Sequence, residues 1–439
     1  MDTPSWAESR TRAAAYCRRR PEESALFRIV YHYRDEFERR WEELFQPQYG
    51  TLRREALDAL DRYLNCGILF CGAARAYCAN CKHSQLIAFS CKRRGLCPSC
   101  DAKRGVIFAE HINDNVLFPL PHRHLTFSIP KRLRVFFKYD RKLIKLLYRA
   151  AWLAWCEAVG DALPDGRTGM IAALHTSGDL LNWHPHIHAI ALDGTIDADG
   201  TFRQLDRVNT EYLTAVFQRG VFDALLKHEL ITQDVVDNML SWENSGFNAF
   251  ASDPITASDT DRRRFVARYL KKAPLSLQRL KIIESESDPT VQITKHLNDG
   301  DVTRELSPLE FLAQLSCHIP DMWEQTTRYF GIYACRTRGT AKAQHPFSAI
   351  ANAAAAAAID NTVERTEPKR PTSRYWASCI KRIYEIDPLT CPKCGEQMKI
   401  VAFITDPKQL TKLSNHLGIA AWRAPPPFRH STQLHLELD

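Results

Sequence analysis

Two closely spaced cysteine pairs constrain the fold of this chain more than any other feature of its sequence. Cys78-Ala-Asn-Cys81 and Cys97-Pro-Ser-Cys100 have 15 residues between them. Each Cys-x-x-Cys pair directs two thiolates toward one tetrahedral ion, and two such pairs complete a closed site. The spacing therefore predicts a structural zinc ion held by Cys78, Cys81, Cys97 and Cys100, in a module too small to fold without it.

Other cysteines near these pairs leave the ligand set open. Cys66, Cys71 and Cys91 lie close by in the sequence. Three roles are open to each of these cysteines: it replaces one of the four zinc ligands, it binds a second ion, or it is a buried free thiol. The last role is the most frequent for such a cysteine. The N-terminus lacks the apolar core of a signal peptide, so we expect a cytosolic protein whose 14 cysteines are metal ligands and thiols rather than disulfides.

A further cysteine pair, Cys391-Pro-Lys-Cys394, lies near the C-terminus without another Cys-x-x-Cys after it. Two cysteines alone do not close a tetrahedral site. His416 or Cys379 completes a second zinc site with this pair, or no site forms there.

Three histidines alternate along a segment typical of a β-strand, NWHPHIHAI at residues 182–190. Side chains in a strand alternate between two faces, so His184, His186 and His188 share one face. An isolated histidine in a strand is usually an ordinary core or surface residue. Three imidazoles on one face beside an apolar run are costly to bury without a partner, so this pattern predicts a metal site.

Basic residues are concentrated in clusters rather than spread evenly. The formal net charge is +8, and much of it lies in residues 92–104, 130–142, 261–272 and 336–342, with aromatic residues among the charges. This pattern predicts a polyanionic partner, with nucleic acid the first candidate, although any single cluster also fits a solvated helix face. The predicted DNA contacts are Arg93, Arg94, Lys103, Arg104, Arg268, Lys271 and Lys272.

The order of apolar patterns predicts an α+β fold in which helices pack on an antiparallel sheet. Residues 123–130, 168–175 and 186–192 have strand patterns, whereas residues 133–160 have a long helical pattern. Shorter helices are predicted at residues 308–318 and 261–272, the latter capped by Asp261 and ended by Ala273-Pro274. An alanine-rich stretch at 349–359 and a polar stretch at 365–374 are typical of a connection.

Tyr269 is the candidate nucleophile. It lies in RRRFVARYLKKAP among six lysine and arginine side chains, one helical turn after Phe265. An aromatic residue at this spacing is more often part of a core. A phenol with a pKa of about 10 needs nearby positive charge or a metal ion to become reactive, and this segment supplies cations.

Several motifs occur together in an order that resembles rolling-circle transposases of the insertion-sequence ninety-one type, including the related common-region elements. They are CANC, FSCKRRGLCPSC, HLTFSIP, NWHPHIHA, FVARYLKKAPLS and DPLTCPKCGEQMKIVAFI, spread over residues 60–405. These proteins join a zinc-binding region to an HUH nuclease, where HUH denotes histidine, hydrophobic residue, histidine. The resemblance implies a transposase that acts on single-stranded DNA at element ends in the bacterial cytosol, associated with the nucleoid.

The resemblance also implies roles for individual residues. His186 and His188 match the HUH pair and would bind a catalytic divalent ion, Mg²⁺ or Mn²⁺, with His184 as a third contact or a neighbour. Some family members have two tyrosines four residues apart, whereas this chain has Phe265 in the first position and Tyr269 in the second. A single-tyrosine enzyme that forms a 5′-phosphotyrosine is therefore expected. Host replication proteins are expected as partners, and no association with a membrane is expected.

Together these patterns predict five segments. They are a helical N-terminal region (1–63), a zinc-binding domain (64–110), an HUH nuclease domain (111–345), a linker (346–374) and a C-terminal cysteine-knuckle unit (375–439). Three alternatives remain: an HUH replication initiator or relaxase, a zinc-finger DNA-binding protein without catalysis, and a metal hydrolase that uses water as the nucleophile.

Overall fold

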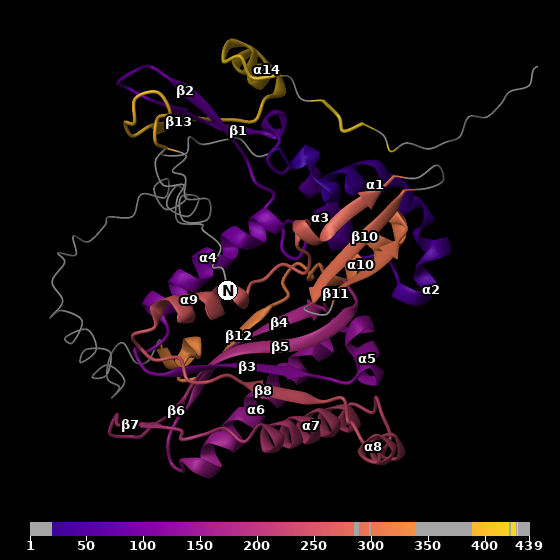
Figure 1. Cartoon of the computed structure of the whole chain (residues 1–439), viewed down its shortest axis with the longest axis vertical. Coiled ribbons are helices and arrows are strands. Elements are labelled where there is room, and N and C mark those ends of the chain that lie inside the picture. The colour runs from indigo at the N-terminus through magenta and orange to yellow at the C-terminus, as the bar shows by residue number, and fades with distance from the viewer. Residues whose placement is uncertain are drawn as a thin grey trace, which may run out of the picture.

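A computed structural model describes residues 20–284, 289–297, 300–338, 389–420, 423–426 and 428 (Figure 1). The alanine-rich stretch 349–359 and the linker 346–374 lie outside the described residues, as does Cys379. None of the described helices could span a membrane, because each is too short or too polar.

A five-stranded antiparallel sheet forms the centre of the molecule, as the α+β prediction required. Its strands lie in the order β12-β4-β5-β3-β8. Their bounds are β3 His122–Ser128, β4 Gly169–Ser177, β5 Trp183–Leu192, β8 Asn248–Ala251 and β12 Thr327–Gly331. Each of the three predicted strand segments is therefore a strand of this sheet.

One face of the sheet is covered by helices. Phe127, Ala172 and Ile187 point to this face and pack against Trp155 and Phe217 in a continuous apolar core. The covering helices are α5 Arg134–Tyr139, α6 Ile144–Ala162 and α7 Thr210–Lys227, followed by α8 Gln233–Leu240.

The opposite face is covered only at one end. There Ile171, Ile190 and Leu192 pack against α4 (Pro98–Asn115) and α9 (Thr260–Tyr269), which lie side by side (Figure 1). Because side chains alternate, the histidines of β5 point to this same face, at the end that the helices leave open. The fold thereby places polar side chains at one end of an otherwise apolar surface.

The predicted boundary at residue 63 does not separate two cores. Helices α1 (Ala25–Leu44) and α3 (Arg54–Leu64) share one apolar cluster with Cys66, Cys97 and Cys100. The same cluster includes α10 and a three-stranded sheet from later in the chain. Their bounds are α10 Pro308–His318, β9 Leu280–Ile283, β10 Thr290–Leu297 and β11 Gly300–Leu306.

The predicted C-terminal unit is likewise not separate from the zinc-binding region. Strand β13 (Lys399–Ile404) pairs with β1 (Ala73–Tyr77), which in turn pairs with β2 (Ser84–Ala88). Helix α14 (Pro407–His416) lies beside this sheet at one end of the molecule (Figure 1). The smaller elements are α2 Gln46–Tyr49, η1 Pro21–Glu23, η2 Leu69–Cys71, η3 Lys131–Leu133, η4 Arg141–Leu143, η5 Leu277–Arg279, β6 Gly194–Ile196 and β7 Phe202–Gln204.

Two predicted helices have different bounds in the structure. The 133–160 helix is interrupted at Asp140, whose extended backbone and side-chain bond to the Lys142 amide begin a new turn. The 261–272 helix begins earlier, because Asp259 rather than Asp261 accepts the capping hydrogen bond from the Arg262 amide. It also ends earlier, at Tyr269. The prediction for α10 at 308–318 is confirmed.

Candidate active site and cysteine clusters

A cluster of three histidines lies where β4 and β5 leave the cover of the helices. The antiparallel register pairs His175 of β4 with His186 of β5, and His188 lies on the same face. One ring nitrogen from each of His175, His186 and His188 lies within 4.8 Å of the others. We call these three residues the histidine cluster.

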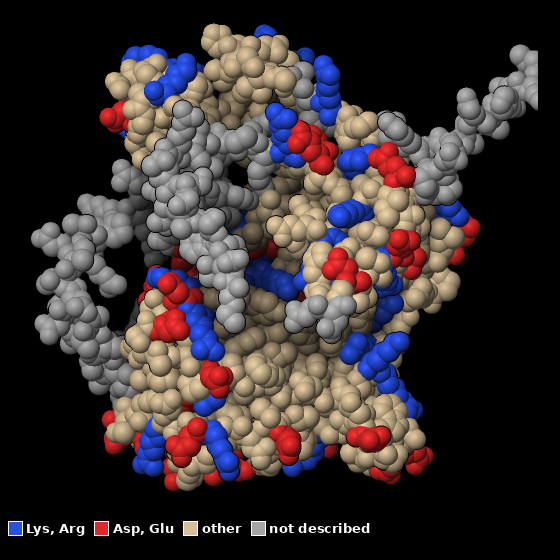
Figure 2. Space-filling model, viewed as in Figure 1, with Lys and Arg blue, Asp and Glu red and all other residues tan. Residues whose placement is uncertain are grey.

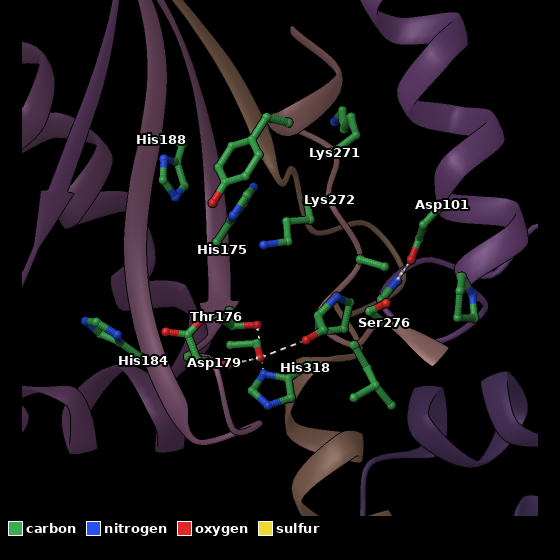
Figure 3. Close-up of a pocket in the computed structure, with 18 of the residues that line it drawn as sticks. Asp101, His175, Thr176, Asp179, His184, His188, Lys271, Lys272, Ser276 and His318 are labelled. Carbon is green, nitrogen blue, oxygen red and sulfur yellow. Dashed lines mark hydrogen bonds between the residues drawn. The ribbon is translucent and has the colours of Figure 1, made fainter. Parts of the chain in front are cut away.

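His184 is not part of this cluster, although it shares the strand face as predicted. Its ring centroid is 4.9 Å from that of His186, and Figure 3 shows it farther along β5. The third histidine that the structure brings together with His186 and His188 is His175, which the sequence analysis did not select. Only the register between two strands places His175 there.

Hydrogen bonds leave the Nε2 atoms of the histidine cluster available. His186 Nδ1 is 2.7 Å from the carbonyl oxygen of His184, so Nδ1 carries the proton and donates. His188 Nδ1 is 3.0 Å from the Thr126 hydroxyl and also 3.0 Å from Nε2 of His124. Among the described residues, Nε2 of His175 and Nε2 of His188 are buried without any hydrogen-bond partner.

Burial keeps these imidazoles neutral near pH 7. Desolvation lowers the pKa of His175 to about 3 and that of His184 to about 4, with nearby cations contributing. Burial also lowers the pKa values of His186 and His188. A neutral imidazole is the protonation state that binds a metal ion. The buried, unpaired Nε2 atoms of His175 and His188, together with Nε2 of His186, therefore fit a cation.

Tyr269, the last residue of α9, lies directly over the histidine cluster. Its ring centroid is 4.9 Å from that of His188 and 5.5 Å from that of His175. Burial raises the pKa of Tyr269, with a further contribution from Asp179, while Arg279 lowers it. Lys272 places its ammonium 5.1 Å from the centre of the tyrosine ring.

The zinc-binding region positions the helix that carries Tyr269. Helix α4 packs along α9, and at Gly105 the backbone is so close that an added Cβ would lie 3.4 Å from the Arg268 carbonyl oxygen. Ala267 and Leu270, before and after the tyrosine, pack in one apolar cluster with Ile171 and Ile190 of the central sheet. Tyr269 is thus held from α4 on one side and from the central sheet on the other.

The histidine cluster and Tyr269 line a cleft of about 1480 Å³. Its lining contains eight lysine and arginine side chains but only two aspartates, Asp101 and Asp179. Blue side chains are visible inside the hollow in Figure 2. The cationic residues are Arg94, Arg104, Arg141, Arg268, Lys271, Lys272, Arg279 and Lys295.

Five of the seven predicted DNA contacts line this cleft: Arg94, Arg104, Arg268, Lys271 and Lys272. Arg93 instead forms an ion pair with Asp58 at 2.9 Å, and Lys103 is not in the lining. Lys271 is half-buried in the wall of the cleft, where desolvation and neighbouring arginines lower its pKa to about 8. Arg279 and Lys295, which the sequence analysis did not select, lie beside Asp179.

The first cysteine cluster consists of Cys66, Cys91, Cys97 and Cys100. Their Sγ atoms all lie within 4.8 Å of one another, with Cys66 to Cys97 at 3.6 Å and Cys91 to Cys100 at 3.6 Å. Cys97 and Cys100 lie at the start of α4. This cluster therefore lies at the end of the helix that supports Tyr269.

The second cysteine cluster consists of Cys78, Cys81, Cys391 and Cys394. Sγ of Cys78 is 3.5 Å from that of Cys394, and Sγ of Cys81 is 3.4 Å from that of Cys391. The two halves have the same turn: the first cysteine amide donates to the carbonyl of the residue five positions later, at 2.8 Å in each case. The residue after each second cysteine, Lys82 or Gly395, has a positive φ.

The predicted single site of Cys78, Cys81, Cys97 and Cys100 is therefore wrong in its pairing. Those four residues are divided between two clusters because β13 brings the C-terminal pair against β1. His416 is not a member of either cluster, and the exposed Cys71 donates to the Asn65 side chain. Two sets of four thiolates each match the donor set of a closed zinc site.

Comparisons with known proteins agree with this architecture. Residues 36–129 match a family model described as a transposase zinc-binding domain, and residues 169–341 match one described as "Putative transposase". The chain is 27% identical over 381 residues to the transposase for insertion sequence element IS801 of Pseudomonas savastanoi pv. phaseolicola, covering 83% of this chain and 87% of that protein. It is 24% identical over 336 residues to "Putative transposase y4qJ" of Sinorhizobium fredii, covering 70% and 81%. No solved structure matches.

The zinc-binding region, the central sheet and these matches define a transposase. Within that class, the resemblance to transposases of the insertion-sequence ninety-one type is confirmed.

Proposed function

We propose that this transposase cleaves and rejoins single-stranded DNA at the ends of its element, with Tyr269 as the nucleophile. The observation that carries the proposal is the position of Tyr269, whose ring lies 4.9 Å from His188, centroid to centroid, inside a cationic cleft. This arrangement supplies a nucleophile, a candidate cation site and a binding surface for phosphates in one place.

In the proposed reaction, Tyr269 Oη attacks the phosphorus of a phosphodiester. The new bond is a 5′-phosphotyrosine, and the bond that breaks is the one from phosphorus to the 3′-oxygen. The phenol loses its proton and the departing 3′-oxygen gains one, which leaves a free 3′-hydroxyl. Since burial raises the pKa of Tyr269, the reaction needs nearby positive charge to favour the phenolate, and Lys272 lies over the ring.

The histidine cluster fits a divalent ion such as Mg²⁺ or Mn²⁺. His175 and His188 each have an unpaired buried Nε2, and the hydrogen bond from His186 Nδ1 fixes the tautomer that leaves its Nε2 free. When bound, the ion would supply Lewis-acid stabilisation of charge on the phosphate. An all-imidazole donor set favours Mn²⁺ over Mg²⁺, which prefers oxygen ligands.

The cleft favours an unpaired strand over a duplex. Tyr269 and the histidines lie at its floor, where His188 is only 6% exposed, so the phosphate must enter the cleft. An unpaired strand can bend to bring one phosphate to this floor, whereas a duplex is stiff over such lengths. The cationic lining, including Arg268 and Arg279, would neutralise the phosphates on either side.

A full strand transfer requires a second step. With one tyrosine, either Tyr269 acts twice, the freed 3′-hydroxyl attacks, or a second protomer takes part. Host replication proteins would copy the strand left behind, and binding of DNA would associate the protein with the nucleoid. A replication initiator or relaxase would use the same chemistry, but the matched relatives are transposases.

The test is incubation of the purified protein with end-labelled single-stranded DNA carrying candidate element ends and Mn²⁺ or Mg²⁺, followed by denaturing electrophoresis. Wild-type protein should form a labelled band that survives denaturation, and Tyr269→Phe should not. Tyr329→Phe is the matched control, because Tyr329 is also partly buried near α9 but does not line the cleft. Cleavage by Tyr269→Phe would indicate water as the nucleophile, and unchanged DNA activities would indicate a non-catalytic binder.

A further inference from the structure

A short turn at the rim of the cleft exposes two large apolar side chains. Residues 321–324, Asp-Met-Trp-Glu, lie in the connection between α10 and β12, and Pro320 and Thr326 on either side line the cleft. Met322 is 64% exposed and Trp323 is 87% exposed. Within the described part of the chain, Trp323 is the most exposed large apolar side chain.

The exposure of Trp323 does not come from a loosely held turn, because three arginines bind the backbone and acidic side chains around it. Arg53 donates to Asp321 at 2.6 Å, and Arg94 donates to the carbonyl oxygens of Glu324 and Asp321 at 2.7 and 3.0 Å. Arg141 forms two bonds to the Glu324 carboxylate, at 2.7 and 3.0 Å.

These arginines come from three separate parts of the chain, before α3, beside the first cysteine cluster and before α6. The ion pair of Arg141 and Glu324 is largely buried, with side chains only 8% and 13% exposed. Charge-assisted bonds of this kind fix geometry. The turn therefore holds the indole ring of Trp323 in solvent in a defined position. Exposing so much apolar surface is unfavourable, and the folding of the turn does not require it.

We propose that Trp323 is a stacking platform for an unpaired DNA base where the strand leaves the cleft. The proposal rests on the proposed function, because it assigns the path of the same single strand. A strand with one phosphate at Tyr269 has to cross the rim, and the cationic lining favours a polyanion there over an apolar protein surface. A tryptophan held in place beforehand provides a large π-face that accepts any base, with little loss of side-chain freedom.

The test measures binding of fluorescein-labelled oligothymidylate by anisotropy, without metal and in the Tyr269→Phe background, so that no cleavage is needed. Trp323→Ala should weaken binding by about 5- to 100-fold, while Trp323→Phe should retain most of the affinity. The matched control is Trp242→Ala. Trp242 is 38% exposed, but none of residues 240–244 lines the cleft, whereas Trp323 lies between Pro320 and Thr326, which both do. The dependence of affinity on salt should stay the same, because no phosphate contact is removed.

A strand of the same length made of abasic deoxyribose phosphates separates stacking from other causes. Trp323→Ala and its parent should bind this strand equally. Equal affinities for oligothymidylate, or an equal loss on both strands, would overturn the proposal, as would a parent protein that prefers duplex DNA. Formation of the tyrosine adduct in wild-type protein is measured separately, so a failure of the proposed chemistry is distinguishable from a failure of the stacking assignment.

Discussion

Replacing His175 by alanine tests the site at the residue that the sequence did not single out. In the metal-free protein the change removes the ring contacts of His175 with His188 and Tyr269, at 4.5 and 5.5 Å between centroids, which together are worth about 1 kcal/mol. It also removes a buried Nε2 that has no partner. The two effects oppose each other, so we expect the free energy of unfolding without added metal to change by no more than about 1–2 kcal/mol.

With metal the expected effect is larger. Mn²⁺ at 100 times its dissociation constant stabilises a folded protein by about 2.7 kcal/mol. If loss of one ligand weakens affinity by about 100-fold, the same Mn²⁺ concentration equals the new dissociation constant and stabilises by only about 0.4 kcal/mol. The mutation should therefore remove most of the metal-dependent stabilisation while leaving the metal-free protein nearly unchanged.

The assay is isothermal titration of Mn²⁺ into zinc-loaded protein, together with unfolding curves with and without Mn²⁺. His184→Ala is the matched control, because His184 lies on the same face of β5 but outside the histidine cluster. Comparable losses of Mn²⁺ affinity in both variants, or a loss in His184→Ala alone, would refute the assignment of His175.

Further outcomes are expected elsewhere in the molecule. Cys394→Ser should reduce bound zinc from two ions to one per chain, measured by atomic absorption, and should leave more DNA cleavage than Cys100→Ser, whose cluster lies at the start of α4. Burial lowers the pKa of His122 to about 3, whereas an unfolded histidine has a pKa of about 6.5. Below pH 6.5 the unfolded chain therefore binds a proton at His122 that the folded protein does not, and the free energy of unfolding declines as the pH falls toward 3. The unfolding free energy should fall by about 1.4 kcal/mol per pH unit in that range from this group alone, and His122→Gln should reduce the slope by that amount in urea titrations; an unchanged slope would contradict this. Mn²⁺ should support more cleavage than Mg²⁺ at equal concentration, and the reverse order would argue against an all-imidazole site.

The local features of the fold could be predicted because they depend on residues close together in sequence. The alternation in β5 gives the shared face of His186 and His188 whatever the rest of the chain does. The Pro308–His318 helix has its own cap and apolar pattern, and its bounds are those predicted. The antiparallel sheet with packed helices also follows from the order of these local patterns, which predicted its three inner strands, β4, β5 and β3, but not the edge strands β8 and β12.

What could not be predicted depends on pairing between distant segments. His175 joins the histidine cluster only in one register of β4 against β5, and a shift by one residue would turn its side chain to the opposite face. A Cys-x-x-Cys pair predicts that two thiolates point in the same direction, but it does not predict which other cysteines complete the site. Cys78 and Cys81 meet residues more than 300 positions later because β13 lies next to β1.

The division of ligands in the second cysteine cluster has a consequence for synthesis of the protein. Cys81 leaves the ribosome hundreds of residues before Cys391, which at about 5–20 residues per second corresponds to roughly 15–60 s. During that interval the N-terminal half of this site has only two of its four thiolates. The second zinc ion can be enclosed only after the C-terminal pair has been translated, so its presence distinguishes a finished polypeptide from a truncated one.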